Sequence, residues 1–164
     1  MFSRVALLML TLLLGLSQNA WAQPEVDWVH VDKSIRKMYL KSGDEVVKEY
    51  RIALGSKPKG HKRKEGDQRT PEGWYTLDYK KEDSYYYRSF HIDYPNAKDR
   101  RIAKALGVSP GGRVMIHGQK PIEAGFSPLA QNFDWTNGCI AVTNDEMDEV
   151  MSLVKEGTPI FIEW

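Results

Sequence analysis

The sequence has very little cysteine: Cys139 is the only one among 164 residues. A single cysteine cannot form a disulfide within the chain, so this thiol is either free or bridged to another chain. The sequence also lacks the C-x-x-C and H-E-x-x-H spacings that zinc sites use. We therefore expect no metal site.

An excess of charge of one sign is also missing, because 23 Lys and Arg residues balance 22 Asp and Glu residues. Proteins that bind nucleic acid normally carry a clear basic excess, so nucleic acid is not an expected partner. The clearest basic cluster, Lys57 to Lys64, has no periodicity, and we expect a solvated loop there. A content of 41% hydrophobic and 27% charged residues is typical of an ordinary globular domain.

Long hydrophobic runs are absent as well. The longest apolar run, Val5 to Leu16, has 12 residues, whereas about 20 are needed to span a bilayer. Arg4 precedes this run, and Ala20-Trp21-Ala22 follows it in the A-x-A pattern of a cleavage site. We predict that residues 1–22 are a signal peptide and that residues 23–164 form a single periplasmic domain with no stable membrane span.

Hydrophobic alternation predicts a mainly β fold. Short runs bounded by polar turns predict strands at 28–31, 35–41, 46–54, 74–77, 85–94, 113–117, 140–142 and 159–164. Between them, residues 55–73 contain Gly, Pro and charge without periodicity, which predicts a long loop of functional interest. We expect Thr70-Pro71-Glu72-Gly73 to form the turn that ends it.

Two short helices complete the prediction. Pro95-Asn96 is a typical helix start for Ala97 to Leu106, with Gly107 just beyond the end. Thr143 and Glu146 form a capping box ahead of apolar residues at helical spacing, which predicts a helix from Asn144 to Glu156.

Cys139 is the residue with the clearest chemical potential. It directly follows Gly138, where backbone N–H groups can converge beside the sulfur as an oxyanion hole requires. A nucleophilic thiol needs a base, usually histidine, that takes its proton and lowers its pKa. His117 ends an apolar strand at a Gly turn and is the best candidate, whereas His30 and His91 lie in strand-like runs and His61 lies in the basic loop, where it contacts substrate or only water. The alternative is a buried, inert cysteine.

Three segments together resemble a known family. Thr70-Pro71-Glu72-Gly73, then Ile116-His117-Gly118, then Thr136-Asn137-Gly138-Cys139-Ile140 are similar in order and spacing to the L,D-transpeptidase catalytic domain of the YkuD type. The resemblance implies a mixed β-sandwich in which Cys139 is the nucleophile and His117 the general base, oriented by a backbone carbonyl at or near Gly118. It also implies an oxyanion hole from the N–H groups of Gly138 and Cys139, and no metal or organic cofactor.

The substrate that this resemblance implies is a peptidoglycan stem peptide. In the family, the thiolate attacks the carbonyl of the third residue, a diamino acid, releases D-Ala and passes the acyl group to an amine acceptor. A water acceptor gives an L,D-carboxypeptidase instead, and the related amidases detach a wall-anchored lipoprotein. A catalytically silent wall-binding module is the alternative from another functional class.

The sequence departs from the family pattern at two positions. Thr136 stands where the family has Ser, and its hydroxyl is still expected to support the site; Ala141 stands where the family has Arg. Loss of that cation leaves substrate binding to other residues, with Arg113 and Arg69 as candidates. Trp135, Asn137 and Arg113 are the further residues that we expect to contact substrate.

Overall fold

The computed structural model describes residues 24–120 and 128–164, so the predicted signal peptide lies outside the described residues. In this part of the chain, eight strands form one mixed sheet in the order β3-β2-β1-β8-β4-β5-β6-β7. The strands are β1 Trp28–Asp32, β2 Lys37–Ser42, β3 Glu45–Arg51, β4 Gly73–Ser84, β5 Tyr87–Ile92, β6 Met115–His117, β7 Ile140–Ala141 and β8 Thr158–Glu163.

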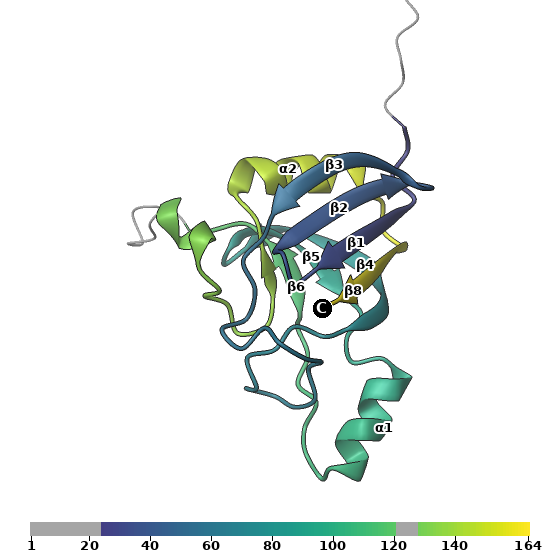
Figure 1. Cartoon of the computed structure of the whole chain (residues 1–164), viewed down its shortest axis with the longest axis vertical. Coiled ribbons are helices and arrows are strands. Elements are labelled where there is room, and N and C mark those ends of the chain that lie inside the picture. Colours follow the sequence, from purple (N-terminus) through teal and green to yellow (C-terminus); the bar gives the residue numbers. More distant parts are fainter. Residues whose placement is uncertain (1–23, 121–127) are drawn as a thin grey trace, which may run out of the picture.

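The sheet is antiparallel except at two places. The C-terminal strand β8 inserts between β1 and β4 and runs parallel to β1, and β6 runs parallel to β7. The sheet is strongly bent, with β1, β2 and β3 in front of β5 and β6 (Figure 1). Alternating buried residues of these strands, together with one face of α2 (Asn144–Leu153), form a single apolar core.

The helix predictions are confirmed in position and differ in length. Helix α1 spans Ala97–Ala105 and is capped by Asn96. Helix α2 starts at the predicted capping box of Thr143 and Glu146 but ends at Leu153, because Val154 turns into extended backbone and is fully buried. A short 3₁₀ helix, η2 (Pro128–Asn132), lies between β6 and β7. The predicted mainly β fold with two helices is confirmed.

The third predicted strand ends earlier than expected, and this difference places the site. Strand β3 stops at Arg51, after which Ala53 forms an isolated antiparallel bridge with Ala141, and Gly55 a parallel one with Thr136. The chain thus leaves the N-terminal hairpin and runs directly beside the segment that carries Cys139. The long loop 55–73 is thereby attached to that segment.

None of the helices within 24–120 and 128–164 has both the length and the apolar character needed to cross a bilayer.

Candidate active site

Cys139 lies at the end of a tight turn that enters β7. The Thr136 hydroxyl accepts a hydrogen bond from the Gly138 N–H at 3.1 Å and donates one to the Cys139 carbonyl at 2.8 Å. Thr136 is only 4% exposed, so water does not compete for these bonds. A single hydroxyl therefore holds the turn closed on both sides of Gly138.

Gly138 allows the turn to pack against the long loop. Its φ is +127°, and a Cβ at this position would lie 2.5 Å from the Arg69 carbonyl oxygen. Only glycine fits this backbone conformation and this close approach. Since the Gly138 N–H is bonded to Thr136, the donor that we expected from this residue for an oxyanion hole is occupied. The Cys139 N–H is the remaining donor of the predicted pair.

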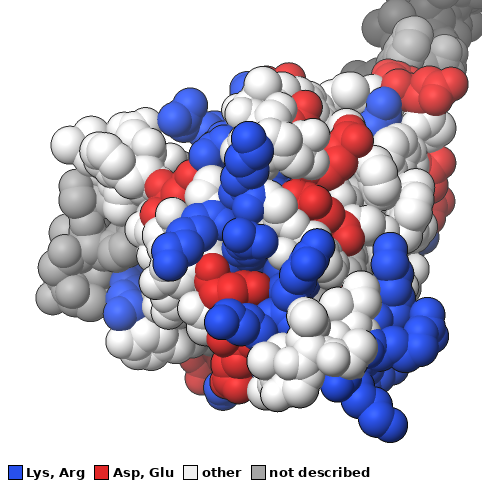
Figure 2. Space-filling model, turned by 60° about the horizontal axis from the view of Figure 1, so that its bottom comes forward, with Lys and Arg blue, Asp and Glu red and all other residues white. Residues whose placement is uncertain are grey.

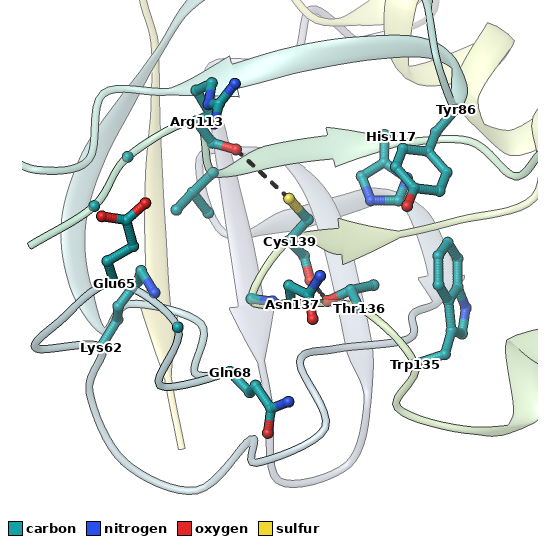
Figure 3. Close-up of a pocket in the computed structure, with 15 residues that line it drawn as sticks. Lys62, Glu65, Gln68, Tyr86, Arg113, His117, Trp135, Thr136, Asn137 and Cys139 are labelled. Carbon is teal, nitrogen blue, oxygen red and sulfur yellow. Dashed lines mark hydrogen bonds between the residues drawn. The ribbon is translucent and has the colours of Figure 1, made fainter.

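His117 ends β6 beside this turn. Register pairs Ile116 with Ile140 and His117 with Ala141. The imidazole at the end of β6 and the sulfur just before β7 therefore face the same pocket (Figure 3). The imidazole Nδ1 lies 2.6 Å from the Gly118 carbonyl oxygen. A carbonyl can only accept, so the proton is assigned to Nδ1 and the lone pair to Nε2. The ring is thus held in the tautomer that a general base requires.

Two aromatic rings enclose the imidazole of His117. Tyr86, in the turn between β4 and β5, stacks on it at a centroid distance of 4.6 Å, and Trp135 meets it edge-on at 5.6 Å. His117 is 3% exposed as a result. Trp135, which we predicted as a substrate contact, therefore lies in the wall of the pocket against the predicted base.

Burial sets the protonation state of both groups. It lowers the pKa of His117 to about 4, and the hydrogen bond to the Gly118 carbonyl only partly opposes this shift. Burial also raises the pKa of the Cys139 thiol, although the Met115 N–H and the Lys62 charge act in the opposite direction. We expected a lowered pKa for this thiol beside its partner histidine, and that expectation was wrong because removal from water outweighs the effects of the Met115 N–H and the Lys62 charge. The resting pair is a neutral thiol and a neutral imidazole.

The thiol itself points at a backbone oxygen. The Cys139 Sγ donates to the Arg113 carbonyl at 3.7 Å (Figure 3). Arg113 has a φ of +53°, an uncommon conformation for a residue with a side chain. Its carbonyl contacts the sulfur while its side chain is exposed at the pocket rim. Arg113, which we predicted as a substrate contact, thus lies at the pocket, and its backbone carbonyl contacts the thiol.

The pocket has a volume of about 630 Å³. Apart from Tyr86 and His117, its walls come from three segments, which contribute residues from 62–68, 111–114 and 135–139. Lys62 and Glu65 lie on the opposite side of the pocket from Trp135 (Figure 3). Asn137 lines the pocket and is exposed. The pocket thus has an aromatic wall at the imidazole and a charged wall on the long loop.

Lys62 was missed by the sequence reasoning, which treated the basic loop as solvated. Its side chain is 4% exposed, and its ammonium donates to Asp67 at 2.9 Å and to the Lys64 carbonyl at 3.1 Å. It lies about as close to the turn as packing allows, since a Cβ on Gly138 would be 3.8 Å from the Nζ. Lys62 supplies a buried cation at the pocket. No periodic signal marked it, because the loop has none.

Arg69, the other cation considered as a replacement, does not line the pocket. It contributes its carbonyl beneath Gly138, and its guanidinium extends toward Gly60. At the position of the family Arg, Ala141 is fully buried and exchanges backbone hydrogen bonds with Ala53. The Gln131 amide donates to the Ala141 carbonyl at 2.7 Å, so a side-chain amide occupies the space beside it.

The other three histidines have structural partners. His30 pairs with Glu163 at 2.8 Å and His91 with Asp78 at 2.7 Å. His61 accepts the Glu72 N–H at Nδ1 and lies 3.1 Å from Asp99 through Nε2. The expectation that His61 contacts substrate or only water was wrong, because the loop folds back onto α1. Within 24–120 and 128–164, no three His, Cys, Asp or Glu residues are grouped as a metal ion would require.

Comparison with known proteins identifies the domain. The YkuD family, described as the L,D-transpeptidase catalytic domain, matches residues 26–162. The protein YafK of Escherichia coli strain K12, itself named as a proposed L,D-transpeptidase, is 33% identical over 141 residues, which cover 84% of this chain and 50% of YafK.

Solved structures agree with this match. The helical cell shape determining protein Pgp2 of Campylobacter jejuni is 28% identical with a TM-score of 0.63, over 82% of this chain and 46% of that one. An L,D-transpeptidase of Xylanimonas cellulosilytica shares the fold at 15% identity and a TM-score of 0.54, over 85% and 61%. The chain thus spans about half the length of YafK and Pgp2. The match over residues 26–162 and the identity to YafK show that this chain belongs to the YkuD family of L,D-transpeptidase catalytic domains.

Proposed function

We propose that this chain is an exported cysteine acyltransferase that acts on peptidoglycan stem peptides, with Cys139 as nucleophile and His117 as general base. The observation that carries the proposal is the joint placement of a thiol and an imidazole of assigned tautomer in one pocket of about 630 Å³. Membership of the L,D-transpeptidase family supports transfer chemistry and a peptidoglycan substrate.

The first half-reaction follows from the neutral resting pair. As the thiol approaches the carbonyl carbon of the third stem residue, the His117 Nε2 takes its proton, and a carbon–sulfur bond forms. The Cys139 N–H donates to the oxygen as it becomes negative. The bond to the terminal D-Ala then breaks, and its nitrogen leaves with the proton from Nε2. The product is a thioester on Cys139.

The second half-reaction reverses these roles. An amine from another stem peptide attacks the thioester, His117 accepts its proton, and the thiol is restored with that proton. Water in place of the amine gives an L,D-carboxypeptidase when D-Ala is the leaving group, and an amidase when a wall-anchored lipoprotein is the leaving group. The open, polar rim with Asn137 and Arg113 is compatible with either acceptor. We propose these two residues and Trp135 as substrate contacts.

Mass spectrometry of muropeptides tests this function. Purified tetrapeptide monomers and lipoprotein-linked muropeptides are incubated with the protein and with the Cys139→Ala and His117→Gln variants. New L,D-linked dimers that only the unmodified protein produces would establish a transpeptidase. Loss of D-Ala or of the linked peptide would establish a hydrolase. No change that depends on Cys139, with any of these substrates, would contradict the proposal and favour a silent wall-binding module.

A further inference from the structure

Helix α1 concentrates positive charge on a near-neutral molecule. Its nine residues include four cations, and all four are exposed; its acidic residue, Asp99, is only 3% exposed and bonded to Tyr75. The cations are Lys98, Arg100, Arg101 and Lys104. The helix therefore presents basic side chains to solvent without an exposed acid of its own.

The same helix protrudes from the domain. It lies below the sheet, connected by extended segments at both ends (Figure 1). When the bottom of the molecule is turned forward, Lys and Arg side chains gather on the side where α1 lies, with no acidic side chain between them (Figure 2). The positive charge is thus carried by the most prominent part of the molecule.

Apolar side chains lie at the end of this basic helix. Leu106, the C-terminal cap, is 54% exposed, and Val108 is 36% exposed. Gly107 separates them and turns the chain at φ +65°. Two branched apolar residues at the tip of a cationic helix form an amphipathic pattern that the fold of the domain does not use.

The long loop extends this basic surface. Arg63 lines a second cavity of about 500 Å³ together with Lys98 and Ile102 of α1. Of the two acids of this cavity, Glu72 is paired with the Lys33 ammonium, and Glu163 contacts His30, which carries a charge only when it is protonated. Glu163 is thus the acid that offsets part of the positive charge of Arg63 and Lys98.

We propose that α1 and its apolar tip form a docking surface for a bilayer of anionic phospholipids. The cations attract the headgroups, and Leu106 and Val108 enter the interface beneath them. A soluble polyanion would contact the cations alone. The exposed apolar side chains at the tip would be buried only in the apolar part of a bilayer. From the tip, the chain continues to Gly111 and Arg113 at the pocket rim, so docking holds the pocket near the membrane surface.

Vesicle co-sedimentation tests the docking surface. The chain is used from residue 23 onward, because every strand and helix that the structure describes lies beyond that point and the apolar run 5–16 would itself bind lipid. Vesicles contain phosphatidylglycerol with phosphatidylcholine, or phosphatidylcholine alone. We expect binding to the anionic vesicles that is lost at about 0.5 M salt, and a roughly 25-fold weaker partition for Arg101→Gln with Lys104→Gln.

A control variant with two substitutions removes the same amount of positive charge from another part of the surface, and we call it the matched pair. Lys81→Gln with Lys155→Gln removes two exposed cations from the sheet and the end of α2, and it should bind as the unmodified chain does. Leu106→Gln should weaken vesicle binding at least about fivefold while leaving the affinity for inorganic polyphosphate unchanged.

Three results would overturn the proposal. The first is no binding to anionic vesicles at low salt, and the second is an equal loss in the matched pair. The third is unchanged vesicle binding by Leu106→Gln together with a loss of polyphosphate affinity in the double variant of α1. This combination would assign the surface to a soluble polyanion. Circular dichroism of every variant checks that α1 is retained.

Discussion

At the scale of single residues, His117 combines two features that act against each other in the folded state. Burial between Tyr86 and Trp135 disfavours the charged ring, while the Gly118 carbonyl holds the proton on Nδ1. The pKa of about 4 keeps the imidazole neutral at every physiological pH. The neutral ring is free to accept a proton, but its low pKa also makes it a weak base toward a thiol whose own pKa is raised, so proton transfer has to accompany bond formation to the substrate carbonyl.

This pKa predicts how stability depends on pH. Unfolding restores the pKa of His117 to ~6.5, so between these values the unfolded chain binds the extra proton. Stability contributed by neutral His117 is therefore present above pH 6.5 and is lost as the pH falls toward 4. We expect about 2–3 kcal/mol less stability at pH 4.5 than at pH 7.5 from this group.

Urea unfolding at the two pH values measures this effect. His117→Gln keeps a side chain of similar size without a titrating ring, and it should show a pH dependence smaller by that amount. An unchanged pH dependence in the variant would mean that other groups account for the acid sensitivity.

Thr136 carries a second prediction. Thr136→Val keeps the shape but leaves the buried Gly138 N–H without its acceptor, at a cost of about 1–3 kcal/mol. The turn then relaxes, and we expect acylation of Cys139 to slow roughly 10²-fold. Thr136→Ser keeps the hydroxyl and introduces the residue that the family has at this position, so it should retain most of the rate of Cys139 acylation. Intact-protein mass spectrometry of thioester formation separates the two variants.

At the scale of elements, the long loop 55–73 is an anchored part of the site. The Lys33 ammonium, at the end of β1, donates to the Gly60 and Thr70 carbonyls at 3.1 and 3.0 Å and to Glu72 at 2.9 Å. Lys33 is fully buried. One side chain thus connects the first strand to both ends of the loop that supports Gly138.

Removal of this anchor should loosen the loop before the sheet. Lys33→Met leaves three acceptors without a donor, and we expect a loss of about 3 kcal/mol in the free energy of unfolding. Glu72→Gln retains an acceptor oxygen and should cost less. Hydrogen exchange should show increased exposure of 55–73 in Lys33→Met and little change in β1 and β8. An equal increase across the sheet would contradict the role of a local anchor.

At the scale of the whole molecule, local sequence patterns predicted where most strands and helices lie. Alternation predicted most strands, and the pair Pro95-Asn96 and the capping box at Thr143 marked the two helix starts. Strand order was not predictable, because the insertion of β8 between β1 and β4 depends on pairing across more than 70 residues. The same holds for Lys62 and Lys33, whose burial is created by loop contacts without periodicity.

The pairing of Cys139 with His117 could be anticipated because His117 ends an apolar run just before Gly118 and Cys139 begins another just after Gly138. The occupied Gly138 N–H could not, because it depends on how the Thr136 side chain turns. The raised thiol pKa also depends on packing, which no spacing reveals.

Export is a prediction about the whole chain. Cleavage after Ala22 would leave a protein of residues 23–164, which retains every strand and helix described above. Intact mass of the protein recovered from the periplasm should correspond to a chain that begins at Gln23. A mass that retains residues 1–22 would contradict the signal peptide and favour an anchor.

The buried contact of Ala53, Ala141 and Gln131 limits how the sequence can change over evolutionary time. Ala141 is fully buried, so an arginine there would need space and a partner for its charge that a single substitution does not supply, and that substitution is expected to be disfavoured. Among relatives, an arginine at the position of Ala141 should accompany changes in the residues that surround it, and alignment of their sequences checks this covariation.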